Sequence, residues 1–245
     1  FIDNPENTSF SYDPDNFYWN FTLKLAEEQK KISEGRCLLH FPDLIEGLDT
    51  LEAMRGGQNL IYDLYDRPEW VHQSLERITE LYFYYYNRLY ELLRDDTGGS
   101  CFWSWGPGKT AKFQCDFSAM LSPELFGEFM VPVLQQMTRK VDYSIYHWDG
   151  PDALKHWEHL VNIRDLDVIQ WIAGAGQLPS EDSSWWPYYH RILEAGKGVM
   201  IQNVTLDGLK ALKREFGDKW KRFIIRTSYD TRKEIDQAFS IAEDV

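Results

Sequence analysis

Short apolar runs alternate with helical patterns along most of this 245-residue chain, and this alternation is the feature that most restricts its fold. Six runs are typical of buried strands, and each is followed by a segment with helical periodicity. The runs are Arg36–Phe41, Ser100–Trp105, Tyr143–His147, Leu166–Ile172, Gly198–Asn203 and Arg222–Arg226. Such an order predicts a parallel sheet with helices outside it.

Six strand–helix units are two fewer than a closed (β/α)8 barrel contains. The chain begins with Phe1 rather than methionine, and its first twenty residues have the composition of a loop. We therefore predict a mixed α/β fold, a (β/α)8 TIM barrel that lacks its N-terminal portion in this chain. An open doubly wound sheet is the alternative. No repeat or low-complexity linker is present, so we expect a single domain over residues 1–245, with an extended segment and a helix in residues 1–34.

The clearest predicted helix precedes the second apolar run. Its apolar residues recur at spacings of three and four, which places them on one helix face. They are Val71, Leu75, Ile78, Tyr82, Tyr85, Leu89 and Leu92. The preceding Asp66-Arg-Pro-Glu69 predicts the helix start, with Asp66 as the cap, an early proline and a capping-box glutamate.

Charge and cysteine content narrow the partners that the chain can have. Lys and Arg number 26 against 39 Asp and Glu, so the net charge is −13, and an acidic surface repels nucleic acid. No apolar run approaches the roughly 18 residues needed to cross a bilayer, so we expect no membrane partner. Three cysteines without CxxC spacing suit a reducing, cytoplasmic compartment. Tyr84 and Tyr86 are the aromatic residues that would suit the face of a homodimer.

In a barrel of this type the active site lies at the carboxyl ends of the strands. The residues that follow the predicted strands are rich in titratable and aromatic side chains, which favours a pocket for a small-molecule substrate. The predicted substrate-binding residues are Asp43, Trp103, Trp105, Gln170, Trp171 and Gln202. The predicted catalytic residues are His147, Asp149, Asp116 and Tyr229.

His147 and Asp149 form the most informative pair. Two residues apart at the end of a strand, their side chains point the same way. They could bind a divalent metal such as zinc, or serve as a base and the group that orients it, or simply form a strand end and a turn. A metal would need a third ligand, for which Asp116, Cys115 and Gln202 are the candidates.

The geometry of parallel strands predicts where these side chains meet. We expect His147, Asp149, Asp116, Gln170 and Gln202 to converge on one cavity, because the strand ends surround a single opening. Neighbours on a strand alternate between its faces. We therefore expect Gln170 to face the barrel, with Trp171 bending over its mouth.

From Asp43 onward the sequence also resembles the uroporphyrinogen decarboxylase superfamily. The matching segments are Asp66-Arg-Pro-Glu69, Asp116-Phe-Ser-Ala-Met-Leu-Ser-Pro-Glu-Leu-Phe126, Tyr146-His-Trp-Asp-Gly-Pro-Asp-Ala-Leu154 and Ile169-Gln-Trp-Ile-Ala-Gly-Ala-Gly176. The last two are most similar to patterns of a bacterial subgroup. The superfamily includes the decarboxylase of haem biosynthesis and zinc-dependent methyltransferases that serve corrinoid proteins, so the resemblance implies a TIM barrel with one of these activities.

Departures from the family patterns bear on the reaction. The methyltransferases bind zinc through His-x-Cys and a later Cys, whereas Asp149 stands at the first Cys position here and no Cys follows Cys115. Any metal site must therefore use hard ligands, mainly oxygen atoms, instead of thiolates. The Gly-His-Gly motif of the decarboxylase is replaced by Thr227-Ser-Tyr-Asp230, which weakens that reading.

We therefore expect a methyltransferase-like enzyme that transfers a methyl group between a small substrate and a corrinoid carried by a partner protein. The rival hypothesis is a cofactor-free decarboxylase (a lyase) acting on a porphyrinogen-like or other carboxylated substrate. In that case Asp116 or Asp149 would stabilise a protonated pyrrole-like intermediate. A non-catalytic binding barrel is the third alternative.

Overall fold

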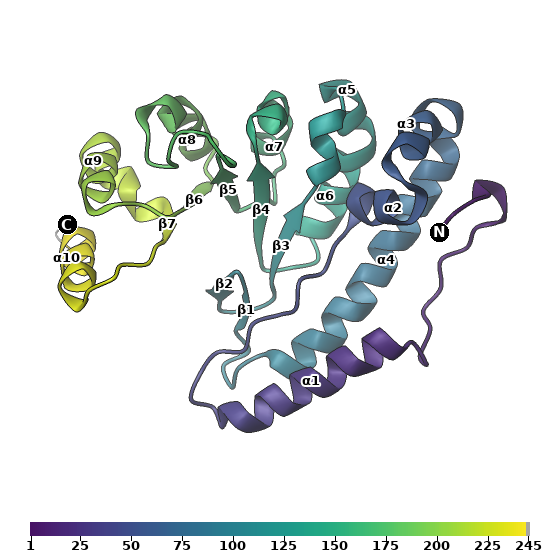
Figure 1. Ribbon diagram of the computed structural model, residues 1–245, viewed down its shortest axis with the longest axis horizontal. Coiled ribbons are helices and arrows are strands. Elements are labelled where there is room, and N and C mark those ends of the chain that lie inside the picture. The colour runs from purple at the N-terminus through teal and green to yellow at the C-terminus, as the bar shows by residue number, and fades with distance from the viewer. Residues whose placement is uncertain (244–245) are drawn as a thin grey trace. The chain divides into compact units, whose positions relative to one another are not determined.

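The computed structural model describes residues 1–243, and the chain divides into two compact units. Unit 1 comprises Phe1–Ile145, and unit 2 begins at Tyr146. The fold is mixed α/β, as the alternation predicts (Figure 1). Its main sheet is parallel and five-stranded, in the order β3-β4-β5-β6-β7. A separate two-stranded sheet pairs β1 with β2.

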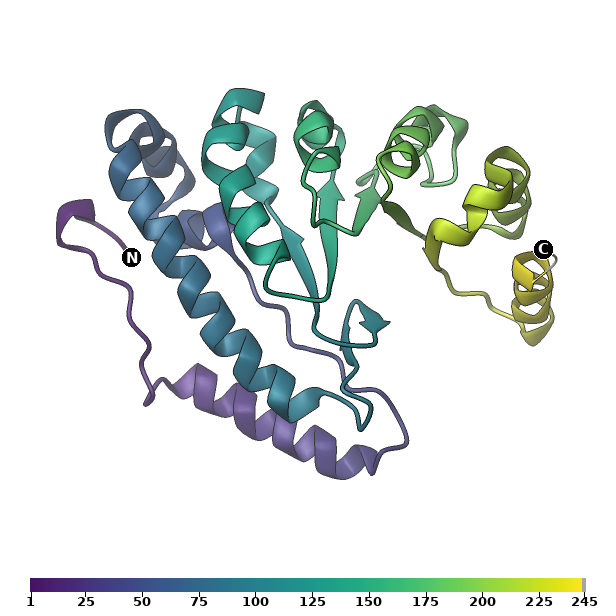
Figure 2. The same ribbon diagram turned by 180° about the vertical axis from the view of Figure 1, so that it is seen from behind.

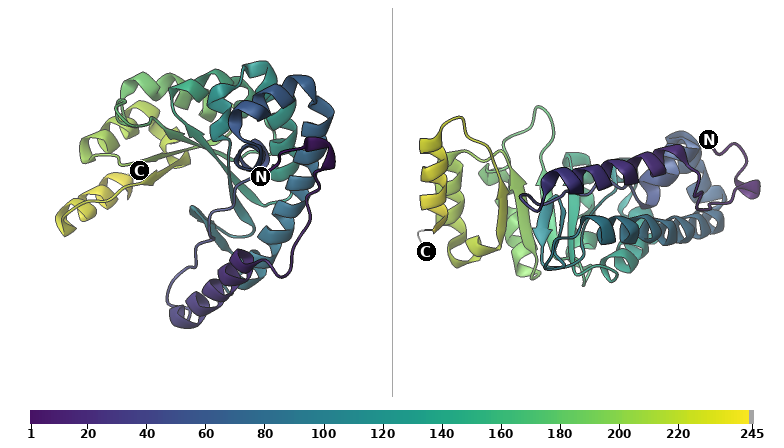
Figure 3. Two further views of the ribbon diagram at one scale, coloured as in Figure 1. Left: turned by 45° about the vertical axis from the view of Figure 1, so that its right-hand side comes forward. Right: turned by 90° about the horizontal axis from the view of Figure 1, so that it is seen from below.

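Unit 1 is mainly helical. Its helices are η1 (Pro5–Asn7), α1 (Phe17–Ser33), α2 (Gly47–Arg55), α3 (Gly57–Asp66), α4 (Pro68–Leu93), η2 (Asp116–Met120), α5 (Pro123–Leu125), the π-helical η3 (Phe126–Met130) and α6 (Val131–Thr138). Its strands are β1 (Ser100–Phe102), β2 (Ser104–Gly106) and β3 (Thr110–Gln114), and β4 (Tyr143–Asp149) crosses into unit 2. Figures 2 and 3 show α1 lying against the C-terminal half of α4.

Helix α4 confirms the strongest helical pattern of the sequence. Its buried face includes Val71, Leu75, Ile78, Tyr82 and Leu89 as predicted. Tyr86 and Leu93 are buried in place of the predicted Tyr85 and Leu92, which are half-buried. Pro68 is the first helical residue, whereas Asp66 is not the cap, because it ends α3. Tyr86 is fully buried and donates its hydroxyl to the Thr110 carbonyl at 2.9 Å, so its assignment to a dimer face was wrong.

The first two predicted strands require correction. Of the run 36–41, only His40 makes a strand-like contact, an isolated parallel bridge to Cys101. The run 100–105 is not one strand, because β1 and β2 form an antiparallel hairpin that turns at Trp103, whose φ is +67°. The strand of the parallel sheet is instead β3, which the apolar pattern missed because Thr110, Lys112 and Gln114 interrupt it.

Unit 2 follows the predicted alternation closely. Its strands after β4 are β5 (Val168–Ile172), β6 (Gly198–Gln202) and β7 (Phe223–Arg226), and β6 pairs in parallel with both neighbours. The helices are η4 (Pro151–His156), α7 (Trp157–Val161), η5 (Ser183–Trp185), α8 (Trp186–Glu194), α9 (Leu206–Phe216), η6 (Gly217–Arg222) and α10 (Arg232–Glu243). In Figure 1, α7, α8 and α9 follow one another along the same side of the strands.

Local sequence explains the best-defined helix of unit 2. The Thr205 side chain accepts a hydrogen bond from the Gly208 N–H and caps α9. Leu209, Leu212 and Phe216 recur at helical spacing and are buried. The buried apolar spacing and the polar cap therefore indicate the same helix.

Among residues 1–243, no helix has the length and apolar character that crossing a membrane requires.

Candidate functional site

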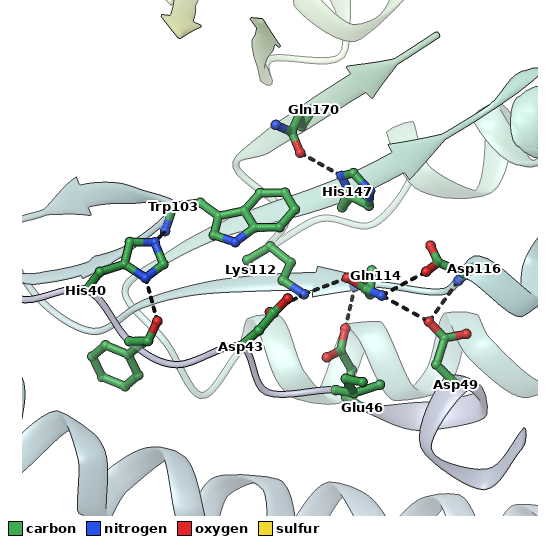
Figure 4. A network of polar contacts seen from close by, with 12 residues as sticks. His40, Asp43, Glu46, Asp49, Trp103, Lys112, Gln114, Asp116, His147 and Gln170 are labelled. Carbon is green, nitrogen blue, oxygen red and sulfur yellow. Dashed lines mark hydrogen bonds and ion pairs between the residues drawn. The ribbon is translucent and has the colours of Figure 1, made fainter. Parts of the chain in front are cut away.

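Unit 1 contains a cluster of polar side chains at the carboxyl end of β3 (Figure 4). Lys112 and Gln114 project from the strand, whereas Ala111 and Phe113 alternate with them, and Phe113 lies against Tyr82 of α4. Three carboxyl groups spaced three residues apart lie close to this polar face. They are Asp43 and Glu46, from the segment that leads into α2, and Asp49, in the first turn of that helix.

Lys112 is the cation of this cluster and has no solvent exposure. Its Nζ lies 2.7 Å from Asp43 Oδ1 and donates to Gln114 Oε1 at 2.6 Å. The same ammonium lies 5.0 Å from the centre of the Trp103 ring, within cation–π distance. The Asp43 side chain is 56% exposed, so it is the member of the pair that solvent or a ligand reaches.

The Gln114 amide links Lys112 to two carboxylates. Its Oε1 accepts from Lys112, so Nε2 is directed at Asp116 Oδ2 (3.1 Å) and Asp49 Oδ2 (3.4 Å). Asp49 also accepts the backbone N–H groups of Asp116 and Phe117 at 2.8 and 2.9 Å, where η2 begins. Asp116 is therefore held through both its main chain and its side chain, while it stays exposed.

Glu46 differs from the other carboxyl groups of the cluster because it is completely buried. Its Oε1 accepts the backbone N–H of Gln114, whereas its Oε2 has no hydrogen-bond partner. Burial raises the pKa of Glu46 well above its usual range, and the nearby Lys112 charge opposes this shift without cancelling it. The shift favours the protonated form of Glu46 in the folded protein.

His40 fixes the hairpin residue that covers Lys112. The backbone N–H of Trp103 donates to His40 Nε2 at 2.8 Å, so the proton of the neutral ring is on Nδ1, which donates to the Phe41 carbonyl. This bond helps to hold Trp103 at positive φ, a region that bulky residues seldom adopt.

Unit 2 contains the predicted His147–Asp149 pair, and the structure brings both residues together with a predicted partner. His147 Nδ1 donates to Gln170 Oε1 at 2.7 Å, with the amide oriented as the structure assigns it. His147 Nε2 lies 3.9 Å from Asp149 Oδ2. That distance is too long for a direct hydrogen bond, and it suits two groups that bind one cation or one water. Gln170 Nε2 is buried without a partner.

The orientation of Trp171 corrects one prediction. β5 continues to Ile172, so Gln170 and Trp171 face opposite sides of the strand. Trp171 is buried, with its ring 4.8 Å from that of Trp148 and 4.9 Å from that of Trp185. The prediction that Trp171 bends over the mouth of the site was therefore wrong, and it is a core residue on the helix side of the sheet.

The remaining predicted residues lie in different surroundings. Trp105 donates its indole N–H to Asp95 and lines a separate cavity of about 520 Å³ in unit 1. Tyr229 donates its hydroxyl to the Val204 carbonyl at 3.0 Å. Gln202 ends β6, where it is aligned with Arg226 of β7.

The donor atoms decide which metal the chain could hold. Burial raises the pKa of the Cys115 thiol well above its usual range, so Cys115 stays protonated and makes a poor metal ligand. His147 and Asp149 supply one nitrogen and one carboxylate oxygen. This set does not fit a zinc–thiolate centre, and it fits a harder divalent cation that takes oxygen ligands.

Several residues of the unit 1 cluster escaped prediction. They are Lys112, Gln114, Asp49 and His40, which all take part in its contacts. The signal that could have found the first two is the strict alternation of polar and apolar residues over 110–114.

No protein-family model matches the chain, and no curated protein matches it either. The resemblance of its motifs to the uroporphyrinogen decarboxylase superfamily therefore stays a prediction, and the functional argument rests on the residues themselves.

Proposed function

We propose that the chain is an enzyme with a (β/α)8 barrel of the uroporphyrinogen decarboxylase type. Its proposed reaction transfers a methyl group between a small substrate and a corrinoid carried by a partner protein. The observation that supports this proposal best is the His147–Gln170–Asp149 arrangement of unit 2. It combines an oriented imidazole with a half-exposed carboxylate.

Each of these residues has a definite role in the proposal. Gln170 accepts the Nδ1 proton of His147 and so fixes both the ring orientation and the tautomer. Nε2 is then the nitrogen that binds a metal or accepts a proton, an arrangement common for metal-binding histidines. Asp149 supplies the neighbouring oxygen, and Asp116 and Gln202 stay the candidates predicted from the sequence for a third ligand. A divalent cation bound there would polarise the substrate atom that carries the methyl group.

Methyl transfer from a substrate heteroatom requires the leaving atom to gain a proton. The bond from the heteroatom to the methyl carbon breaks, the electron pair stays on the heteroatom, and the methyl group passes to the reduced corrinoid. A cation at His147 and Asp149 would lower the cost of the developing negative charge.

The assay mixes the 245-residue chain with cob(I)alamin and a panel of methylated amines, ethers and thioethers, and follows the absorbance change as methylcobalamin forms. We expect turnover that needs a divalent metal and falls at least about 100-fold in His147→Ala. His190→Ala is the matched control, because His190 is a partly exposed histidine that pairs with Glu215 on the surface. Absence of methyl exchange with every donor would reject methyl transfer.

Decarboxylation is the second candidate, and the unit 1 cluster favours it. A decarboxylase needs a cation for the substrate carboxylate and a proton for the carbon that loses CO2. Lys112 and Glu46, whose pKa is raised, are groups of these two kinds, and both are buried beside the exposed carboxylate of Asp43. In this reaction the bond to the carboxyl carbon breaks, its electrons stay on the substrate carbon, and a proton completes the new C–H bond. Release of CO2 from carboxylated pyrroles, lost in Lys112→Met but kept in His147→Ala, would favour it over methyl transfer.

A further inference from the structure

Helix α1 has two apolar faces, although only one of them packs inside unit 1. Trp19 and Ala26 are buried, and the Trp19 ring lies 4.7 Å from that of Tyr85 on α4. The other face carries large apolar side chains along the whole helix. This outer stripe consists of Phe17 (70% exposed), Tyr18 (77%), Phe21 (55%), Leu25 (51%) and Ile32 (72%). Glu28, which pairs with Lys31, interrupts this stripe between Leu25 and Ile32. Monomeric proteins seldom expose so many large apolar side chains on one helix face, which marks the stripe as an interaction site.

A groove adjoins the C-terminal end of the outer stripe. It measures about 600 Å³ and lies between the last turns of α1 and the segment that follows the helix. Ile32 lines one side, Leu38 and Leu39 line the other, and Leu38 is itself 54% exposed. The N-terminal end of the stripe instead projects two aromatic rings, Phe17 and Tyr18, in edge-to-face contact.

We propose that the outer stripe is the interface of a homodimer, in which two α1 helices pair antiparallel about a two-fold axis. In this arrangement Phe17 and Tyr18 of each copy enter the groove beside Ile32 of the other. A two-fold interface requires one patch to be complementary to itself, and this stripe has aromatic rings at one end and a groove at the other. Antiparallel pairing also sets the two helix dipoles in opposition, which is favourable.

The area of the stripe is sufficient for a stable dimer. Its five residues are each about two-thirds exposed, and a large apolar side chain offers roughly 150–250 Å². The stripe therefore provides about 650 Å² per copy, or about 1,300 Å² in total, which is within the range of specific interfaces. The groove and Leu38 add to this area. A second copy of the chain is thus an adequate partner for the exposed face.

Sedimentation velocity over a range of protein concentrations tests the proposal. We expect the wild-type chain to be a dimer and Phe21→Glu to weaken it at least about 100-fold, because a charge would be buried at the centre of the interface. Tyr65→Glu is the matched control, since Tyr65 is an exposed aromatic residue on α3 that lies outside the stripe. Circular dichroism verifies that both variants stay folded. A monomeric wild type, or a dimer that Phe21→Glu leaves intact, would overturn the proposal.

Cysteine crosslinking tests the antiparallel orientation. The midpoint between positions 17 and 32 falls beside Leu25, so residue 25 should face its own counterpart across the axis. In a Cys37→Ser background, which removes the exposed thiol, we expect Leu25→Cys to form a crosslinked dimer and Phe17→Cys to remain uncrosslinked. Crosslinking through Phe17→Cys instead would show parallel helices and reject the arrangement. Binding of the monomer to lipid vesicles, with no self-association, would assign the stripe to a membrane surface and would also overturn the dimer.

Discussion

Replacing Glu46 with glutamine isolates the effect of its buried proton on stability. The Gln side chain keeps the carbonyl oxygen that accepts the Gln114 N–H, and its amide N–H₂ takes the place of the protonated Oε2. Glutamine cannot ionise, so the variant mimics the protonated glutamic acid at every pH. The difference between the two proteins therefore reports the ionisation of Glu46 alone.

The sign of the pH dependence follows from the direction of the pKa shift. The pKa of Glu46 is raised in the folded protein, mainly by burial, above the value near 4.3 of an unfolded chain. Above that pH the unfolded chain releases the proton while the folded protein retains it. The wild-type free energy of unfolding thus falls by about 1.4 kcal/mol per pH unit until the pH reaches the folded pKa. Glu46→Gln escapes this loss, so its relative stability should rise with pH at the same rate.

Urea unfolding followed by tryptophan fluorescence between pH 5 and pH 8 measures this difference. Glu76→Gln is the matched control, because Glu76 is an exposed glutamate on α4, and its difference from wild type should stay nearly constant with pH. The pH at which the Glu46→Gln difference levels off gives the folded pKa. A difference that does not change with pH, or one that favours the wild type as pH rises, would show that Glu46 is ionised in the folded protein and would refute the reasoning.

Three further predictions concern other charged groups. Asp63 is buried and pairs with Arg55 (2.6 Å) and Arg67 (2.9 Å), so Asp63→Asn should lower the free energy of unfolding in urea by about 3 kcal/mol. An unchanged midpoint would contradict this. Buried Lys197 donates to two backbone carbonyls at 2.5 and 2.8 Å, so Lys197→Met should cost about 1–3 kcal/mol in the same assay. Burial lowers the pKa of Lys197, which shows that the charged ammonium is disfavoured in the folded protein. Removing it should therefore lower the free energy of unfolding less than its hydrogen bonds alone would indicate. Hydrogen bonds from Thr97 and Trp105 lower the pKa of Asp95 to about 2, so its carboxyl carbon signal in NMR should titrate near pH 2 and shift upward in Trp105→Phe.

The sequence predicted unit 2 well because β5 and β6 are buried on both faces, and β7 is apolar in sequence although only half-buried. The runs of β5, β6 and β7 are almost entirely apolar, and turn residues separate them from helices with clear periodicity. The His147–Asp149 pair could be predicted from the sequence because the apolar run of β4 predicts the end of that strand to within two residues. The contact with Gln170 then follows from neighbouring strands ending at the same edge.

Unit 1 was harder to predict because tertiary contacts override local preference there. The run 100–105 is apolar and aromatic enough for a strand, yet Trp103 adopts a left-handed conformation that the neighbouring His40 helps to hold. His40 is 63 residues away in sequence, and no local pattern reports such a contact. The hydrogen-bond partners of Glu46 and Asp49 are likewise more than 60 residues away.

β3, the strand that the sequence analysis did not predict, is also the strand that carries the unit 1 cluster. Both facts follow from its alternating polar residues. Both faces of a strand inside a parallel α/β sheet are buried, so a polar face cannot be explained by exposure to solvent. The polar side chains at 112 and 114 therefore need partners within the protein, and they have them in Asp43 and Asp49. At position 110 it is the backbone N–H that has a side-chain partner, the Ser100 hydroxyl. Burying such polar groups costs free energy unless each buried charge is paired and hydrogen-bonded. An alternating strand in an otherwise apolar α/β pattern is consequently a better indicator of a polar site than an isolated titratable residue, and it directs mutagenesis first to Lys112 and Gln114.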